Sequence, residues 1–237
     1  MSHTVITEAH VERGSARLHH LLHRGDESLT PLVYVPGSLG NAEDFRTEML
    51  RLAPRTTVAI SPRGLGGSSA PEHGYSLNDR VQDLEAVLDE LRLPPVCVMA
   101  FSAGVPVAFA YAVRRPEMVK SLILLDNPAR SKRLTQQWAD QAMPFAAERG
   151  VPERVVKAMV ADSADVELWE DIRGIACPAL LVVGGKSNFV TDEDLGRYRE
   201  ALPRLEVEHF EDSGHEVFRP DYERFMRVIE GFLGRSD

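Results

Sequence analysis

Ala100-Phe101-Ser102-Ala103-Gly104 connects an apolar, strand-like run to a helix-like stretch over residues 105–115, and this short segment decides the fold that the sequence predicts. Where a strand turns sharply into a helix, the corner residue is exposed at the edge of a sheet, and the residues two positions away must be small. Ala100 and Gly104 meet this requirement, although the usual pattern has glycine where Ala100 stands. The segment therefore predicts a nucleophile elbow with Ser102 at its corner.

Length, composition and charge limit the class of protein. A chain of 237 residues has the size of one large domain, or of one domain with a modest insertion. Its hydrophobic content of 43% and charged content of 27% are typical of a globular protein. The net charge of -9 argues against nucleic acid or an anionic membrane as the main partner, because both attract basic patches. We expect a small-molecule substrate, and the oligomeric state stays open.

The expected compartment follows from two observations. No apolar run approaches the roughly 20 residues that a membrane span needs. The first residues also lack the charged and then apolar order of a secretory signal. A cytoplasmic location is therefore the default expectation.

Neither the cysteines nor the histidines near the N-terminus predict a disulfide framework or a metal site. Cys97 and Cys177 fall in or beside apolar runs and are too few for a framework, so we expect reduced core residues. His19, His20 and His23 lie in a predicted strand. Along a strand, His19 and His23 are about 13 Å apart, which is too far for them to share one ion.

Short apolar runs alternate with helical periods along the chain, without an internal repeat. Continuous apolar runs are expected where both faces of a sheet are covered, and they occupy residues 32–35, 57–60, 96–99, 122–125 and 180–183. Residues 205–210 form a last strand-like run. Residues 5–11 and 17–23 predict an N-terminal hairpin. The clearest helix has an apolar stripe from Leu77 to Leu91, with Ser76 and Asp79 as caps. This order predicts an α/β protein with a mostly parallel, eight-stranded sheet and helices on both faces.

The loops after the strands carry the candidate chemistry, because ligands of such sheets bind beyond the carboxyl ends of the strands. Pro36-Gly37-Ser38-Leu39-Gly40 follows one strand, and its glycines let a backbone N–H face a ligand. Acyl transfer needs two such donors for the developing oxyanion, and the amides of Ser38 and Ala103 form the natural pair. A second glycine-rich turn, residues 61–68, lacks the Gly-Lys-Ser/Thr ending of a phosphate-binding loop and predicts no nucleotide site.

His215 is the expected general base. It follows the run over residues 205–210 and precedes the last helical stretch, which begins near Pro220. This placement predicts a loop at the same edge of the sheet, where an imidazole can take the proton of Ser102.

From residue 32 onward, the chain resembles the alpha/beta-hydrolase superfamily, especially small esterase, lactonase and C–C hydrolase members with a helical cap. The motifs that carry the resemblance are residues 36–40, 61–68 and 100–104 and Gly214-His215, in the family's order. The resemblance implies a core of residues 1–127 and 172–237 and a helical cap of residues 128–171. It also implies a substrate pocket lined by apolar side chains, for which we select Phe101, Trp138, Met143, Phe145 and Trp169.

The chain departs from the family at the acid of the triad. The acid most often follows the strand at residues 178–183 in a Gly-x-x-Asp turn, but here that turn ends in Ser187. Some members place the acid after the preceding strand, where this chain has Asp126. The resemblance therefore implies Asp126 as the acid. Asp192 and Asp194 are reserve candidates, although they look like the acidic start of a helix.

These residues together predict a serine hydrolase that cleaves a small ester, lactone or thioester through an acyl-enzyme, without a metal or organic cofactor. Ser102 is the nucleophile, His215 the base and Asp126 the acid. Two alternatives stay open. One is a non-hydrolytic enzyme of the same fold, such as a C–C lyase, a cyclase or a cofactor-independent oxygenase, with His215 as the base. The other is a silent ligand-binding protein.

Overall fold

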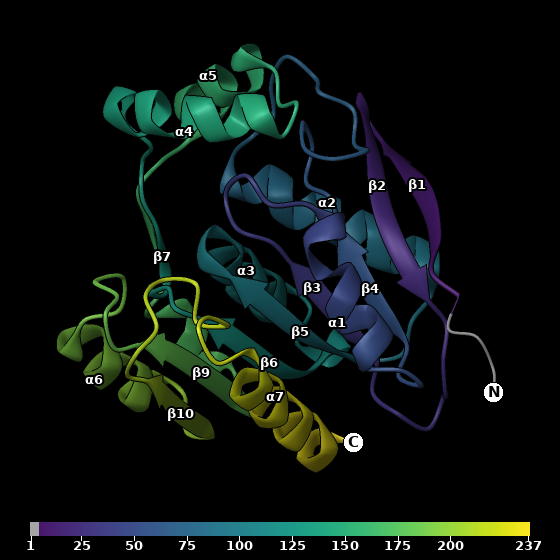
Figure 1. The fold of residues 1–237 in the computed structure, drawn as a ribbon, viewed down its shortest axis with the longest axis vertical. Coiled ribbons are helices and arrows are strands. Elements are labelled where there is room, and N and C mark those ends of the chain that lie inside the picture. Colours follow the sequence, from purple (N-terminus) through teal and green to yellow (C-terminus); the bar gives the residue numbers. More distant parts are fainter. Residues whose placement is uncertain (1–4) are drawn as a thin grey trace.

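An eight-stranded sheet runs through the computed structural model, which describes residues 5–237 (Figure 1). Its strand order is β1-β2-β4-β3-β5-β6-β9-β10. The strands are β1 (Thr7–Arg13), β2 (Ala16–His23), β3 (Leu32–Val35), β4 (Thr57–Ile60), β5 (Val96–Phe101), β6 (Val119–Leu125), β9 (Ala179–Gly184) and β10 (Leu205–Phe210). Only the pairs that involve β2 are antiparallel, so the predicted mostly parallel sheet is confirmed.

Both faces of the sheet are covered, which explains why its strands are continuously apolar. Successive residues of a strand point to opposite faces. In β6, Leu122 and Leu124 therefore join the core cluster on one face, and Ile123 and Leu125 join the cluster on the other. All four side chains are at most 1% exposed.

Seven α-helices surround the sheet in the described part of the chain. Helices α2 (Leu77–Leu91), α3 (Val105–Arg114) and α6 (Asp192–Ala201) contribute to the first cluster, and α1 (Arg46–Arg51) and α7 (Tyr222–Ser236) to the second. The predicted start of α2 is confirmed, because the Ser76 hydroxyl accepts the Asp79 amide and the Asp79 carboxylate accepts the Ser76 amide. Within residues 5–237, no helix is both long enough and apolar enough to cross a membrane.

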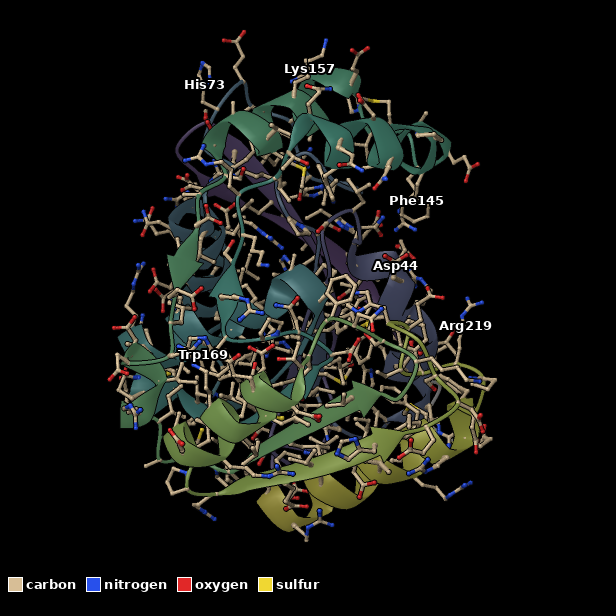
Figure 2. The ribbon with its side chains drawn as sticks, turned by 90° about the vertical axis from the view of Figure 1, so that its left-hand side faces the viewer. Asp44, His73, Phe145, Lys157, Trp169 and Arg219 are labelled. Atoms are coloured by element: carbon tan, nitrogen blue, oxygen red, sulfur yellow. The ribbon has the colours of Figure 1, made fainter. Side chains whose placement is uncertain are left out.

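The remaining two helices, α4 (Gln136–Glu148) and α5 (Glu153–Asp162), form a separate layer above the sheet (Figure 1). Short strands β7 (Arg130–Ser131) and β8 (Val166–Glu167) pair antiparallel, so the chain enters and leaves this layer through two adjacent segments. Figure 2 shows Phe145 pointing down from α4 on the side of the molecule that carries Asp44. The cap boundaries at residues 128 and 171 stay a prediction.

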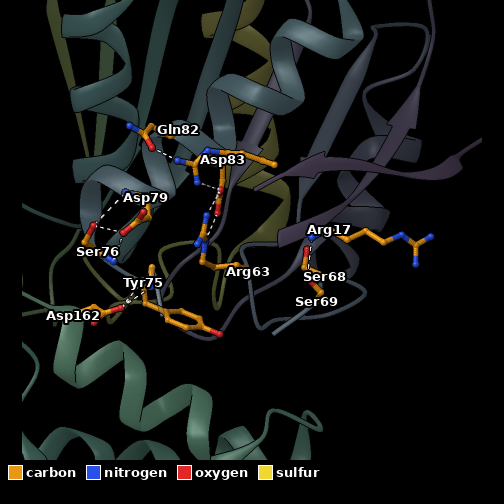
Figure 3. Close-up of polar contacts among 12 residues, drawn as sticks. Arg17, Arg63, Ser68, Ser69, Tyr75, Ser76, Asp79, Gln82, Asp83 and Asp162 are labelled. Carbon is orange, nitrogen blue, oxygen red and sulfur yellow. Dashed lines mark hydrogen bonds and ion pairs between the residues drawn. The ribbon is translucent and has the colours of Figure 1, made fainter. Parts of the chain in front are cut away.

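Polar contacts hold these two helices against the core. The Asp162 carboxylate at the end of α5 accepts the backbone amides of Gly74 and Tyr75 at 2.8 and 2.9 Å (Figure 3). The Arg149 guanidinium at the end of α4 donates to both oxygens of Asp44, which lies in the 3-10 helix η1 (Ala42–Phe45). Shorter 3-10 turns are η2 (Ser102–Gly104), η3 (Pro116–Met118) and η4 (Asp171–Gly174).

Both cysteines are free thiols, as the sequence predicts. Cys97 is buried in β5 and Cys177 is half-buried. Burial raises the pKa of Cys97 to about 12 and the pKa of Cys177 to about 11. Both groups are therefore protonated and unreactive at neutral pH.

His20 is a buried titratable group in β2. Its side chain is 2% exposed, and its Nδ1 atom has no hydrogen-bond partner within the described residues. Burial, together with the neighbouring His19 and His10, lowers the pKa of His20 to about 4. The folded protein therefore resists protonation of this ring at a pH where the unfolded chain accepts the proton.

Acidification should destabilise the fold through His20. Because the folded pKa lies below the unfolded value of about 6.5, stability is lost as the pH falls from about 6.5 toward about 4. Between pH 7.5 and pH 5.0 the loss is about 1 kcal/mol once solvent screening is allowed for. Urea unfolding at both pH values measures it. The variant His20→Gln should lose that much less stability over the same interval, and an identical pH dependence would contradict this assignment.

Candidate active site

Ser102, Asp126 and His215 meet at the carboxyl edge of the sheet, from three different strand ends. Ser102 follows β5, Asp126 follows β6, and His215 lies in the loop after β10. His215 Nε2 lies 2.8 Å from Ser102 Oγ, and His215 Nδ1 lies 2.8 Å from Asp126 Oδ2. Because an ionised carboxylate only accepts hydrogen bonds, the ring proton belongs on Nδ1. The lone pair of Nε2 then faces the hydroxyl of Ser102.

The Asp126 carboxylate is fully buried, and three donors surround it. Besides His215, the Gly184 amide donates to Oδ1 at 3.2 Å and the Ser187 hydroxyl donates to Oδ2 at 2.5 Å. A buried carboxylate costs several kcal/mol unless such partners replace water. Ser187, at the position where the family usually has its acid, therefore acts as a hydrogen-bond donor to the acid from the neighbouring strand.

The reserve acids lie elsewhere. Asp194 is buried, caps α6 through Thr191 and pairs with Arg130 at 2.8 Å. Asp192 is exposed at the first position of that helix. Neither carboxylate contacts His215, so among these candidates the fold brings only Asp126 to the imidazole.

The elbow is tight enough to require small residues. Ser102 has a φ of 51°, in the left-handed region that non-glycine residues rarely occupy. A Cβ at Gly104 would lie 2.5 Å from the Val35 carbonyl oxygen, so a side chain is excluded there. Ala100, which replaces the usual glycine, is completely buried, and its methyl group packs in the core.

The loop after β3 passes directly against the elbow. A Cβ at Gly37 would lie 3.3 Å from the Cβ of Ser102, which shows how closely the two segments approach. Ser38 and Ala103 both line the cavity at this point. That Ser38 and Ala103 donate their amides to a substrate oxygen stays a prediction.

Two side chains that the sequence analysis missed support these groups. The ring of Phe189 stacks on that of His215, with centroids 3.6 Å apart and planes inclined by 11°. The Arg80 guanidinium donates from Nη1 to the carbonyl oxygen of Ala103 at 3.2 Å. Phe189 lies in a loop without periodicity and carries no local signal. Arg80 lies three residues before Asp83 and four before Leu84, on the buried side of α2, so a charged residue within the apolar stripe was a signal that the sequence analysis did not use.

A cavity of about 1350 Å³ opens above Ser102 and His215, between the loops of the core and helices α4 and α5. Phe101, Trp138 and Phe145 line it, and their contact with a substrate stays a prediction. The prediction that Met143 and Trp169 line this cavity is wrong.

The two incorrect residues pack inside the protein instead. Trp169 is 3% exposed and packs edge-on against Tyr198, and Figure 2 shows it far from Phe145. Met143 packs in the apolar cluster between α4, α5 and the core loops. Periodicity identifies an apolar residue, but it does not say which of two neighbouring spaces the side chain fills.

A group of potential metal ligands lies away from the cavity. The ligand atoms of Glu8, His19 and Glu43 lie within 4.8 Å of one another. Glu43, however, accepts two hydrogen bonds from Arg46, and His19 Nδ1 lies 2.9 Å from the Ser61 hydroxyl. Because these atoms already have protein partners, we assign no metal to the group.

Comparisons with known proteins agree with this architecture. Residues 30–150 match the model of the alpha/beta hydrolase fold family. The chain is 30% identical to the 2-(acetamidomethylene)succinate hydrolase of Mesorhizobium japonicum, over 85% of this chain and 87% of that protein. It is 26% identical to an esterase of Mycobacterium tuberculosis, over 85% and 82%. The crystal structure of an esterase from Exiguobacterium antarcticum superposes with a TM-score of 0.81 at 18% identity, over 96% and 100%.

Removal of the Ser187 hydroxyl should weaken the support of Asp126. A hydrogen bond to a charged group is worth about 1.5–3 kcal/mol, so Ser187→Ala should slow the reaction of Ser102 with a fluorophosphonate by about tenfold or more. The control Ser187→Thr keeps a hydroxyl at the same place and should react at nearly the original rate. Equal rates for the alanine variant and the unaltered protein would show that the contact has no effect on Ser102.

Proposed function

Because the chain belongs to the alpha/beta hydrolase fold family, we propose that it is a serine hydrolase that cleaves a small ester, lactone or thioester through an acyl-enzyme intermediate. Its relatives are esterases and other hydrolases of this family. The observation that carries the proposal is the hydrogen-bonded chain from Ser102 through His215 to Asp126, with both contacts at 2.8 Å.

In the first half of the reaction, the Oγ atom of Ser102 attacks the acyl carbon while His215 Nε2 takes the hydroxyl proton. Asp126 keeps the second ring proton on Nδ1 and stabilises the imidazolium that forms. The carbonyl oxygen becomes an oxyanion and accepts hydrogen bonds from the amides of Ser38 and Ala103. The bond to the leaving oxygen or sulfur then breaks, and His215 returns its proton to that atom.

In the second half, water replaces the leaving group. His215 removes a proton from the water while its oxygen attacks the acyl carbon, and the same two amides hold the second oxyanion. Collapse of this intermediate breaks the bond to Ser102 Oγ, which regains its proton from His215. The products are a carboxylic acid and the unmodified enzyme, and the two steps need no group beyond the side chains and amides named.

The surroundings of His215 favour this role. Phe189 covers one face of the imidazole ring, and the ring of Phe101 lies 4.9 Å from it. These contacts restrict the ring to the orientation in which Nε2 faces Ser102. An aromatic face also interacts favourably with the imidazolium that forms during the reaction.

Fluorophosphonate labelling tests the proposal directly. The unaltered protein should form a covalent adduct on Ser102, detected by mass spectrometry of the modified peptide, and Ser102→Ala and His215→Ala should not. Asp126→Asn should reduce turnover of p-nitrophenyl acetate roughly ten-thousand-fold, because the imidazole loses its tautomer control. The matched control Asp192→Asn removes a carboxylate of the later loop that does not contact His215, and should keep the original rate.

Two results would overturn the proposal. One is the absence of both label and ester turnover in the folded, unaltered protein. The other is labelling at a residue different from Ser102. Loss of labelling in Asp192→Asn, with retention in Asp126→Asn, would move the acid to the later loop.

A further inference from the structure

Arg80 is a charged side chain in the wall of the cavity without a carboxylate partner. It lies in the first turn of α2 and borders the same space as Ser102 and His215. Its Nη1 atom donates to the Ala103 carbonyl oxygen at 3.2 Å, but its Nη2 atom is buried and has no partner within the described residues. A buried guanidinium N–H without an acceptor is costly, so such a group calls for an explanation.

Each of the other buried or half-buried arginines around the cavity has a carboxylate partner, which Arg80 lacks. Arg63 donates to both oxygens of Asp83 at 2.7 and 2.5 Å (Figure 3). Arg130 pairs with Asp194 at 2.8 Å, and Arg149 pairs with Asp44 at 2.6 Å. Each of these guanidinium groups is neutralised by the protein, whereas Arg80 is not.

The nearest acids cannot serve Arg80, because they are already engaged. Asp83 accepts hydrogen bonds from Arg63 and from Arg13, which lies 2.9 Å away. Asp79 is occupied by the amide and hydroxyl of Ser76. Three arginines, Arg13, Arg63 and Arg80, thus face two carboxylates, Asp79 and Asp83, which leaves a local excess of positive charge.

Helix stability does not explain this placement either. The first turn of a helix carries the positive end of its dipole and disfavours a cation. Burial lowers the pKa of Arg80 to about 10, but the group remains charged at neutral pH. The protein therefore keeps a positive charge in the wall of the cavity, although the helix dipole and the loss of hydration both disfavour it.

The charge balance of the whole cavity points the same way. Most basic side chains that line it are paired with a carboxylate, namely Arg63, Arg130, Arg149, Lys186 and Arg219. Among the described lining residues this leaves Arg80 and Lys132 against Glu48, although the complete chain has a net charge of -9. A cleft lined by one sign of charge attracts ligands of the opposite sign. The free guanidinium lies beside Ala103, whose amide is one of the two oxyanion donors, so an anion there would lie within a few atoms of the reacting carbonyl.

We propose that the substrate carries a carboxylate group close to the bond that is cleaved, and that Arg80 binds this group. The inference rests on the proposed function and names its substrate class: short acyl compounds with a second, ionised carboxyl group. A guanidinium fork matches a carboxylate in shape and charge. Arg80 borders both the cavity and a void of about 10 Å³ between α2 and the sheet. Because Nη2 is buried, binding of the carboxylate requires the guanidinium to turn toward the cavity.

The competing explanation is one water molecule in that void. A space of about 10 Å³ is at the lower limit for a single water, which would satisfy Nη2 without any ligand. Under that explanation Arg80 would support the elbow alone, and its removal would affect charged and neutral substrates equally.

A matched pair of esters separates the two explanations. The anionic substrate is p-nitrophenyl hydrogen succinate, and the neutral one is its methyl ester. The unaltered protein should have a higher kcat/KM for the anionic ester, and Arg80→Met should lower the anionic-to-neutral ratio by about 10- to 100-fold. Arg80→Lys should keep part of the preference, because the charge remains. Arg173→Met removes an exposed arginine that does not line the cavity and should keep the ratio of the unaltered protein.

A binding measurement on the unaltered protein keeps the inference testable if the Arg80 variants do not fold. Succinate should raise the melting temperature, and the uncharged succinamide should not. Equal effects of the two compounds, or an ester ratio that Arg80→Met does not change, would overturn the inference while ester turnover leaves the proposed function intact. If neither ester is turned over and no adduct forms on Ser102, the proposed function is overturned. The change in melting temperature with succinate would still decide whether the carboxylate site exists.

Discussion

The buried negative charge of Asp126 is the constraint on which the site depends. A carboxylate with no exposure to water is tolerated only where donors replace the lost hydration, and here an imidazole, a hydroxyl and a backbone amide do so. The parallel pairing of β6 with β9 brings two of these donors beside the acid, because Gly184 ends one strand where Asp126 follows the other. The third donor is His215, whose orientation is thereby fixed. The arrangement of Ser102 follows from that orientation.

The same edge of the sheet imposes close backbone approaches. Gly104 lies against the carbonyl groups at the end of β3, and Gly37 lies against Ser102 itself. Ser102 and Asp126 both adopt left-handed backbone conformations, directly after neighbouring parallel strands. Such conformations cost on the order of 1 kcal/mol each and persist because the surrounding packing determines them. Among the described non-glycine residues, only Arg92, at the end of α2, shares this conformation with Ser102 and Asp126.

Much of this arrangement is predictable from sequence, and the limits have physical causes. Continuous apolar runs locate the central strands because both faces of the sheet are covered, and the Ser76–Asp79 capping box locates the start of α2. The elbow is local in sequence, so its pattern survives as a short motif.

The contact between Ser187 and Asp126 spans 61 residues and depends on strand order, which no local pattern reports. The spacing of Arg80 from Leu84 places it on the buried side of α2, but only tertiary packing brings it beside Ala103. The directions in which the Met143 and Trp169 side chains point likewise depend on tertiary packing between elements.

The pairing of β7 with β8 has a consequence for how this protein can change. The chain leaves the core and returns to it through adjacent residues such as Arg130 and Glu167, so both connections of the helical layer lie side by side. Ser102, Asp126 and His215 lie outside this layer, which contributes walls of the cavity but none of these three groups. The layer can therefore be lengthened, shortened or exchanged as a module without disturbing the core sheet. A change in the layer would then alter the walls of the cavity and leave the positions of Ser102, Asp126 and His215 in place.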